Sequence, residues 1–181
     1  EMASESAAEA GVADRCEFRH MDMDHLELRS DSFDVVTNRD SYCYAQNKQR
    51  YLREVFRILA PGGVWSCMDF NVRAGTLSTA EAAELRKVLR GFHIPSLAPL
   101  ARVLSDARAA GFENCTAREL GAAVLPSAVL IMRSAREPLR LARRHPKRRL
   151  HSPDPVEEAN VRGHFAAGMA YSVGLHTGLF E

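Results

Sequence analysis

The chain has 181 residues, of which 46% are hydrophobic and 26% are charged, a composition typical of a globular protein. Its 24 Lys and Arg residues against 23 Asp and Glu residues give a formal net charge of +1, which excludes a global field for binding nucleic acid or an anionic membrane. The longest apolar run, residues 121–132, is interrupted by Pro126 and Ser127 and is too short to span a bilayer. We therefore expect no nucleic-acid partner and no membrane span, and an anionic partner of that kind would have to use a local patch.

The cysteine and histidine spacings favour a reduced protein without a metal ion. The four cysteines, at positions 16, 43, 67 and 115, form no C-x-x-C pair. This pattern predicts a cytoplasmic protein in which free cysteines pack as small hydrophobic residues, with a catalytic cysteine as the less favoured alternative. His20 and His25 lie beside Asp22 and Asp24, and we interpret this segment as a solvated acidic loop rather than a metal site.

In the first 70 residues, helical and extended patterns alternate, with glycine at the boundaries. The expected elements are a helix over residues 1–10 ended by Gly11, an extended segment over 16–21, an acidic loop over 22–31, a strand over 33–37, an amphipathic helix over 48–59 and a strand over 64–70. The β-branched run at 33–37 indicates a parallel strand buried on both faces. Strand, helix and strand in succession predict an open α/β sheet.

The carboxyl ends of these strands are the expected position of a ligand site, because open α/β sheets bind ligands in the crevice beyond those ends. Three segments would surround that crevice, at residues 22–25, 38–44 and 69–73.

Beyond Gly75 the pattern becomes mainly helical. Ser78 as N-cap, with Glu81 three residues later, predicts a capping box at the start of a helix over 78–90. The other expected elements are helices over 97–110, 123–144 and 156–171, strands over 113–120 and 175–180, and a basic, proline-rich linker over 145–155.

Residues 12–70 resemble the central part of the class I S-adenosylmethionine-dependent methyltransferases. Three stretches carry the resemblance, in the order that the family has them: CEFRHMDM from Cys16 to Met23, SFDVVTN from Ser32 to Asn38 and REVFRILAPGG from Arg53 to Gly63. The resemblance implies a Rossmann-like α/β fold with a seven-stranded sheet, S-adenosylmethionine as cofactor and methyl transfer as the activity.

The same resemblance implies the cofactor-binding residues. The family's adenine-contacting acid falls on Asp22, whose carboxylate would accept from the exocyclic amine, while the backbone N–H of Met23 would reach a ring nitrogen. Leu26 is similar to the apolar residue that closes over the adenine. Asn38 and Arg39 lie where the strand end faces the methionine part of the cofactor, and at Asn38 the backbone matters more than the side chain. The alternative for Asp22 is a loop residue that only solvates a turn.

The stretch NRDSYCY, from Asn38 to Tyr44, is similar to the segment after the fourth strand in isoprenoid-diphosphate C-methyltransferases, and more distantly in sterol C-methyltransferases and small-amine N-methyltransferases. The resemblance places Asp40 where that family's Glu faces developing positive charge or takes a proton. We predict Asp40 and Tyr44 as catalytic residues. Because Asp is one methylene shorter than Glu, a purely structural pairing of Asp40 with Arg39 stays open.

Tyr42 and His93 are the predicted substrate-binding residues. Tyr42 would line the pocket with its ring and hydroxyl, with a core position as the alternative. His93 belongs to a stretch that resembles the helical lid of small-molecule methyltransferases, with a surface histidine as the alternative.

The resemblance also divides the chain into a partial cofactor-binding core over residues 1–74, lid helices over 75–111, a core strand over 112–122, a lid helix and basic linker over 123–158, and the final helix and strand of the core over 159–181. Lid helices shield a reactive methyl group from water. The run from Arg133 to Arg149 contains eight Lys and Arg residues. It is either a clamp for diphosphate or another anion, or a solvated helix face with a basic tail, which we favour.

The sequence contains neither the family's glycine-rich loop nor its second-strand acid, so the resemblance implies a sheet that lacks its first two strands and a chain truncated at its N-terminus. On that expectation residues 1–31 dock poorly, and unpaired strand edges invite aggregation. The predicted activity is methyl transfer to a hydrophobic small molecule, with C-methylation of an isoprenoid diphosphate or a related natural product as the specific candidate. A non-catalytic, methyltransferase-like binding or interaction module is the alternative.

Overall fold

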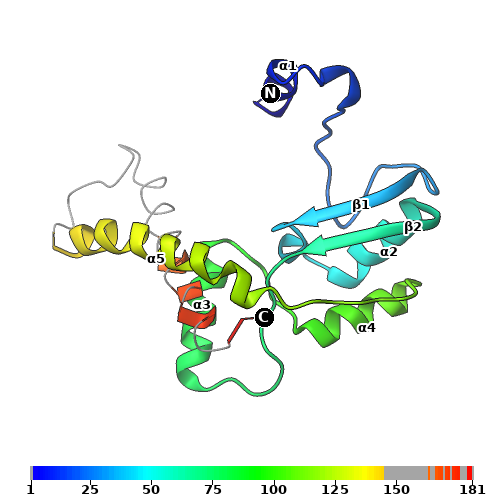
Figure 1. The fold of residues 1–181 in the computed structure, drawn as a ribbon. Coiled ribbons are helices and arrows are strands. Elements are labelled where there is room, and N and C mark those ends of the chain that lie inside the picture. Colours follow the sequence, from blue (N-terminus) through cyan, green and yellow to red (C-terminus); the bar gives the residue numbers. More distant parts are fainter. Residues whose placement is uncertain are drawn as a thin grey trace.

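The computed structural model of the protein describes residues 2–144, 163, 166–168, 170–171, 173–175 and 179–180. The elements are α1 (Met2–Glu9), η1 (Ala13–Arg15), β1 (Phe33–Arg39), η2 (Tyr42–Tyr44), α2 (Lys48–Ile58), β2 (Leu59–Met68), α3 (Thr79–Gly91), α4 (Leu100–Ala110) and α5 (Gly121–Arg144) (Figure 1). None of the helices in these residues is long and apolar enough to cross a membrane.

β1, α2 and β2 form the predicted strand, helix, strand unit. The two strands are parallel, with Val36 opposite Trp65 and Asn38 opposite Cys67. α2 begins after Asn47, whose side chain accepts a hydrogen bond from the backbone N–H of Arg50, and it packs with α4 beneath the sheet (Figure 1). The sheet of the described residues has these two strands alone. Its α/β arrangement confirms the general fold that the sequence predicted.

β2 begins at Leu59, five residues earlier than the pattern predicted, because the strand includes the turn sequence Pro61-Gly62-Gly63. Gly62 has a positive φ of 82°. A Cβ atom at Gly63 would lie 2.8 Å from the carbonyl oxygen of Ala60. These glycines therefore allow the chain to pass directly from α2 into the strand, with a shift in register near Phe33.

The first hydrophobic cluster lies between the sheet and the two helices below it. Tyr51, Leu52 and Val55 of α2 and Val103 and Ala107 of α4 are buried there. Val36 and Trp65 from the sheet pack against this cluster. The apolar spacing of α2 therefore predicted its buried face correctly.

The opposite face of the sheet is uncovered among the described residues. Val35 and Val64, which lie opposite each other in the register, are 57% and 56% exposed. Phe33 and Met68 on the same strands are also exposed. The prediction of a strand buried on both faces is therefore wrong for β1, because α2 and α4 cover one side alone.

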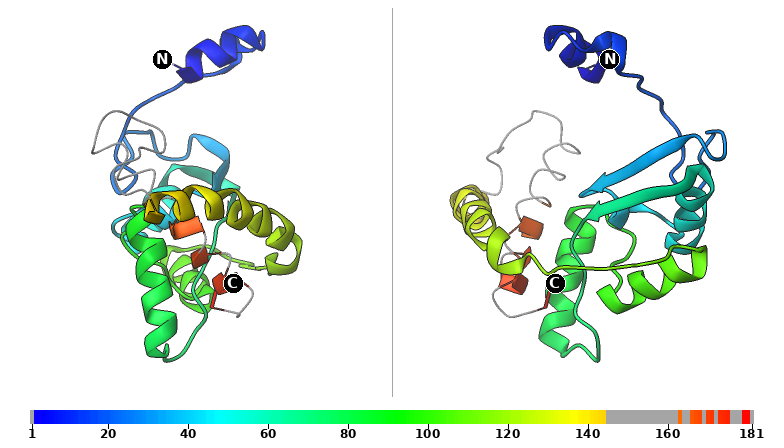
Figure 2. Two further views of the ribbon diagram at one scale, coloured as in Figure 1. Left: turned by 90° about the vertical axis from the view of Figure 1, so that its left-hand side faces the viewer. Right: turned by 45° about the vertical axis from the view of Figure 1, so that its right-hand side comes forward.

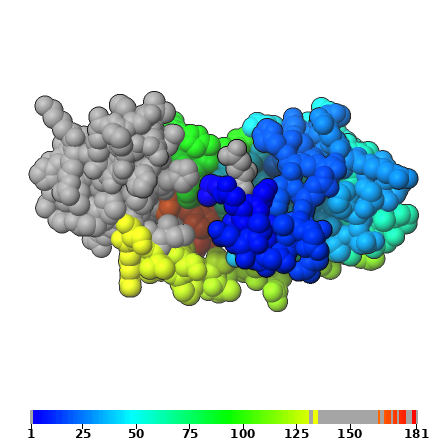
Figure 3. Space-filling view, turned by 90° about the horizontal axis from the view of Figure 1, so that it is seen from above, coloured from blue at the N-terminus to red at the C-terminus, as the bar shows by residue number. Residues whose placement is uncertain are grey.

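The N-terminal residues stand apart from the sheet. α1 ends at a turn in which Gly11 has a φ of 68°, as predicted, and it contacts η1. The views agree that an extended segment joins this pair to the rest of the molecule (Figures 1 and 2), and the view from above shows α1 in dark blue on the outer face (Figure 3). Residues 16–21 pair with no strand in the part of the chain that the structure describes, which corrects the strand-like prediction there, because a strand requires a neighbour with free backbone groups.

The second hydrophobic cluster joins α3 to the C-terminal residues. Val72, Val88 and Phe180 are buried in it, and Val72 forms an isolated antiparallel bridge with Phe180. α3 has the predicted capping box, in which the Ser78 hydroxyl accepts from the N–H of Glu81. Figure 1 shows α3 and α5 on one side of the molecule, away from α4.

Two predicted strands in the second half need correction. Residues 113–120 run extended between α4 and α5 without a strand partner among the described residues, and residues 121–122 belong to α5, so the predicted core strand over 112–122 is not found there. Leu175 is helical rather than extended. The described positions of the predicted helix over 156–171 are helical, and the predicted linker over 145–155 lies outside the described residues, as do residues 176–178.

Candidate functional site

Two aspartates lie side by side at the carboxyl ends of the sheet. Arg39 and Met68 are partners in the last position of the register, so Asp40 and Asp69 follow on neighbouring strands, which are about 5 Å apart in a sheet. The backbone N–H of Asp40 donates to the carbonyl of Met68 at 2.9 Å, and its φ of 50° turns the chain away after β1. Left-handed backbone at a non-glycine residue is a feature that clusters at functional sites.

The carboxylate of Asp69 is fixed by two backbone donors. Its Oδ2 accepts from the N–H of Cys43 at 2.9 Å, and its Oδ1 accepts from the N–H of Phe70 at 2.9 Å. These bonds join η2 to the end of β2. Two of the three segments predicted to surround the crevice, 38–44 and 69–73, are therefore brought together.

Two tyrosines accompany these carboxylates. Burial raises the pKa of Tyr44, and the nearby Cys43, Asp69 and Asp40 raise it further, so the Tyr44 phenol is a hydrogen-bond donor in the neutral range. Burial also raises the pKa of Tyr171 to about 12, with Asp40 and Asp69 adding to it. The sequence did not indicate Tyr171, because its approach to the strand ends depends on how the C-terminal residues pack.

The loop that contains Asp22 is a tight turn tied to the start of α2. The N–H of Asp24 donates to Oδ1 of Asp22 at 2.9 Å, and the N–H of His25 donates to the carbonyl of Asp22 at 3.1 Å. Asp24 accepts from the N–H of Asn47 at 2.8 Å through Oδ2. The third segment of the crevice is thus anchored to the loop that precedes α2.

The Asp22 turn contains carboxylate oxygens that accept no hydrogen bond among the described residues. Oδ1 of Asp24 is buried and has no hydrogen-bond partner among the described residues. Asp22 is exposed, and its second carboxylate oxygen accepts no described hydrogen bond. An exocyclic amine can donate to such oxygens. Met23 packs against the first hydrophobic cluster. This contact anchors the turn to the core, and the other side of the turn faces outward.

The other predicted cofactor-binding residues differ in which of their polar groups already form hydrogen bonds within the protein. Both backbone groups of Leu26 are used, since its N–H donates to Glu54 at 3.1 Å and its carbonyl accepts from Arg57 at 2.8 Å. Its side chain is partly exposed. Arg39 is exposed and makes no described ion pair with Asp40.

Asn38 is a structural residue through its side chain. It is buried, and its Oδ1 accepts from the Tyr51 hydroxyl at 2.7 Å and from Nε1 of Trp65 at 2.8 Å. Its Nδ2 donates to the Ser41 hydroxyl at 2.9 Å. Both polar atoms of the side chain are thus hydrogen-bonded within the protein, and a cofactor contact through the Asn38 backbone stays a prediction.

Tyr42 lies in the core rather than at an open surface. It is 3% exposed, and its ring centroid lies 5.9 Å from that of Tyr51 and 5.7 Å from that of Trp65. Its hydroxyl is buried without a partner among the described residues, and burial raises its pKa. The geometry matches the alternative considered for Tyr42, and a contact with substrate stays a prediction.

Lys48 and Cys43 connect the parts of the site. Nζ of Lys48 donates to the carbonyls of Cys43 and Ala45 at 3.2 Å. Burial lowers the pKa of Lys48, although Asp69 and Asp24 act in the opposite direction. Cys43 is 1% exposed, and burial raises its pKa to about 12, so it packs as a neutral thiol and does not present a nucleophile. In the part of the chain that the structure describes, no three His, Cys, Asp or Glu residues form a metal-binding group.

Residues 1–67 match a family model described as a methyltransferase domain. Among curated proteins, the chain is 30% identical over 115 residues to phosphoethanolamine N-methyltransferase 1 of Triticum aestivum, covering 62% of the chain and 22% of that protein. It is 34% identical over 92 residues to methyltransferase GfsG of Streptomyces halstedii, covering 51% and 31%. It is 29% identical over 128 residues to 27-O-demethylrifamycin SV methyltransferase of Amycolatopsis mediterranei, covering 70% and 46%.

The fold is similar to that of a solved structure assigned as a sarcosine dimethylglycine methyltransferase from Galdieria sulphuraria. The TM-score is 0.72 at 16% identity, with 98% of this chain and 60% of that chain covered. This likeness shows a Rossmann-like fold. The chain spans less than half the length of the three curated relatives.

Proposed function

We propose a methyl-transfer function from the premise that the chain belongs to the class I S-adenosylmethionine-dependent methyltransferases. The intact protein transfers a methyl group from S-adenosylmethionine to a hydrophobic small molecule. An isoprenoid diphosphate methylated at carbon, or a related natural product, is the specific acceptor proposed. Relatives named for phosphoethanolamine and for 27-O-demethylrifamycin SV support the small-molecule class.

The observation that supports this function most is the placement of Asp40 and Asp69 on neighbouring strand ends. The cofactor supplies an electrophilic methyl group when it is bound. An acceptor that gives electrons to a methyl group gains positive charge, which a nearby carboxylate stabilises, and it often must lose a proton. Asp40 has the chemistry for both tasks. Asp69 is fixed by backbone N–H groups and adds to the negative field.

The neighbouring tyrosine has a complementary role in the proposal. The raised pKa of Tyr44 keeps its hydroxyl protonated, so it can donate a hydrogen bond and orient the acceptor. Tyr44 is 41% exposed, which leaves part of its ring open to a ligand. Positioning of this kind contributes strongly to transfer between two bound molecules.

The adenine end of the cofactor is assigned to the Asp22 turn. Asp22 accepts from the exocyclic amine, the Met23 N–H donates to a ring nitrogen, and the Leu26 side chain covers the ring. Backbone groups of Asn38, with Arg39, face the methionine part. Of the predicted lid, residues 75–111 and 123–158, α4 packs with α2 beneath the sheet, so α3 and α5 are the helices to which we assign the exclusion of water from the reacting groups.

Cofactor binding tests this assignment directly. In Asp22→Asn, the new side chain can keep the bond to the Asp24 N–H, but it loses the negative charge and one acceptor. We expect the intact protein to bind S-adenosylmethionine at least about tenfold more weakly in isothermal titration, the loss expected for a charge-assisted hydrogen bond. Asp31→Asn is the matched control, because Asp31 is exposed, has a φ of 52° that Asn tolerates, and lies outside the turn. Equal affinities for the two variants would refute the role of Asp22.

A further inference from the structure

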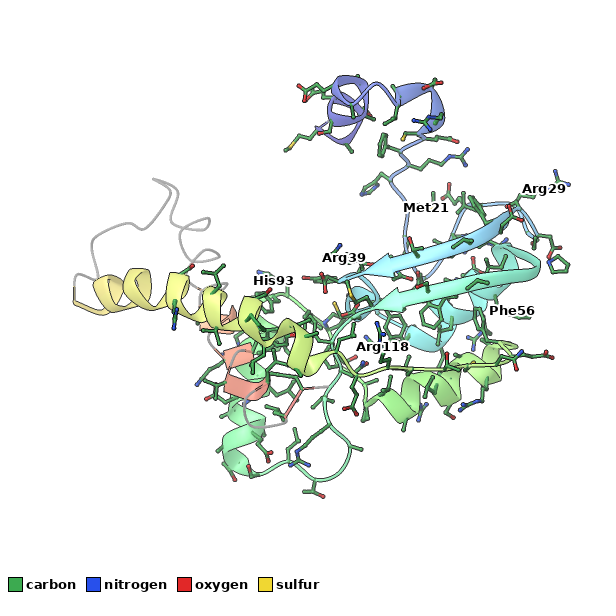
Figure 4. All side chains as sticks on the ribbon, viewed as in Figure 1. Met21, Arg29, Arg39, Phe56, His93 and Arg118 are labelled. Atoms are coloured by element: carbon green, nitrogen blue, oxygen red, sulfur yellow. The ribbon has the colours of Figure 1, made fainter. Side chains whose placement is uncertain are left out.

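A cavity of about 460 Å³ lies against the C-terminal half of α3, and the function proposed above does not account for it. Its described lining consists of three basic side chains, His93 and several small residues. None of the aspartates of the candidate site belongs to that described lining. His93 is labelled in Figure 4, on the side of the molecule opposite Phe56 and Arg29.

The basic side chains of the cavity come from one face of α3. Arg90 lies four residues after Arg86 and three residues after Lys87. These helical spacings bring the three side chains to the same region of the surface. Arg86 and Arg90 form no ion pair within the described part of the chain, whereas Lys87 pairs with Glu84 at 2.6 Å. No acidic side chain occurs among the described lining residues. The described lining is therefore basic, with two guanidinium groups that make no ion pair among the described residues.

His93 reaches the cavity through an unusual backbone conformation. The N–H of Ile94 donates to the carbonyl of Leu89 at 2.8 Å, and the N–H of Phe92 donates to that of Val88 at 3.0 Å. This hydrogen-bonded helix ending places His93 in the left-handed region, with a φ of 56°, where glycine is the usual residue. A histidine that occupies this left-handed position and lines a basic cavity is consistent with a role in ligand binding.

The rest of the wall is apolar and formed by small residues. A Cβ atom at Gly91 would collide with the backbone of Gly163 and with the side chain of Ala167, so α3 and the C-terminal residues are in close contact there. Ala83 and Ala166 line the same cavity. The volume exceeds what a lone phosphate needs and is in the range that accommodates small organic ligands.

We propose that this cavity binds the phosphate or diphosphate group of a small molecule. Arg86 and Arg90 hold the phosphate oxygens, His93 adds a donor, and the organic part lies against the small apolar residues. The binding itself is independent of the function proposed above. That the ligand is the methyl acceptor rests on that proposed function.

Titration with pyrophosphate at constant ionic strength tests the proposal in the intact protein. We expect saturable binding that weakens at least tenfold in the Arg86→Gln, Arg90→Gln double variant. Arg53→Gln is the matched control, because Arg53 is an exposed helical arginine without a described partner, and it should bind as tightly as the wild type. Melting temperatures of all three proteins show whether each is folded.

A second ligand identifies the source of the phosphate group. Dimethylallyl diphosphate should bind more tightly than pyrophosphate if the ligand is an organic ester, and equally if it is the free anion. The absence of saturable binding by the wild type, or an equal loss in Arg53→Gln, would overturn the proposed site. Because no methyl transfer is measured, failure here leaves the proposed function standing, and inactivity in a transfer assay leaves the anion site standing.

Discussion

Asn38 connects the core of the protein to its candidate site through one side chain. The residue ends the buried part of β1, and its amide oxygen accepts from both Tyr51 and Trp65. Asp40 follows two residues later. The hydrogen bonds of Asn38 therefore hold the end of β1 in place, and they thereby help to position the carboxylates beyond it.

The two buried tyrosines next to Asn38 make a matched pair. Tyr51→Phe removes a 2.7 Å bond to Asn38, and we expect a loss of about 1 kcal/mol in the free energy of unfolding, measured in urea. Tyr42→Phe removes a buried hydroxyl that has no described partner, so its effect should be near zero or slightly stabilising. An equal loss in both variants would contradict this prediction, because it would mean that the Tyr42 hydroxyl also makes a hydrogen bond in the folded protein.

At this scale the sequence predicted positions better than roles. A polar residue just beyond the carboxyl end of a parallel strand is expected at a ligand site, and Asp40 and Asp69 occupy such positions. The sequence predicted both Tyr42 and Tyr44 at the site, yet Tyr42 is 3% exposed and Tyr44 is 41% exposed. That difference depends on where α2 and Trp65 pack, which local sequence does not specify.

α3 illustrates what local signals determine at the scale of an element. Glu81 accepts from the Ser78 hydroxyl at 2.7 Å, from the Ser78 N–H at 2.8 Å and from Arg73 at 2.8 Å. The Ser78 hydroxyl and Arg73 are the main causes that lower the pKa of Glu81 to about 2, from an ordinary value of 4.5. Because the pKa is lower in the folded state, the ionised carboxylate stabilises the fold above pH 4.5, and this contribution is lost as the pH falls toward 2.

We therefore expect the stability difference between the wild type and Glu81→Gln to depend on pH. It should be largest above pH 5 and disappear near pH 2, and its size is limited because the side chain faces solvent. Denaturant unfolding at several pH values measures it. Ser78→Ala removes one of the hydrogen-bond donors to Glu81. The pH-dependent part of its stability loss should therefore be smaller over the same pH range. A difference that stays constant down to pH 2 would contradict the assigned cause.

The elements that the sequence misjudged are those that need a distant partner. α2 and α3 carry their own caps and apolar spacing, and both formed where predicted within a few residues. The segment 113–120 was predicted to be a strand, but it has no strand partner among the described residues. Strand formation depends on that pairing, so extended sequence alone was insufficient.

The whole molecule has one feature that follows from its topology. One face of the β1–β2 sheet carries exposed Val35 and Val64, and β1 pairs along one edge alone in the described residues. Exposed apolar surface next to an unpaired strand edge favours association between chains.

We expect the 181-residue chain to self-associate with rising concentration, as measured by static light scattering. Val64→Lys should reduce this association, because the charge would be buried by any partner on that face. Leu130→Lys is the control, since Leu130 is 65% exposed on α5, away from the sheet. A wild-type chain that stays monomeric at high concentration, or an equal effect of both variants, would contradict this prediction.

The proposed role of Asp40 in methyl transfer is tested most directly by one measurement. The intact protein is incubated with S-adenosylmethionine labelled in the methyl group and with prenyl diphosphates, amines and phenols, and the labelled product is counted. We predict methyl transfer to one of these classes. The transfer rate should fall about 100-fold in Asp40→Asn, as expected for the loss of a general base. It should be unchanged in Asp34→Asn, because Asp34 is an exposed aspartate on the preceding strand. No labelled product from any class, or full activity in Asp40→Asn, would contradict the account.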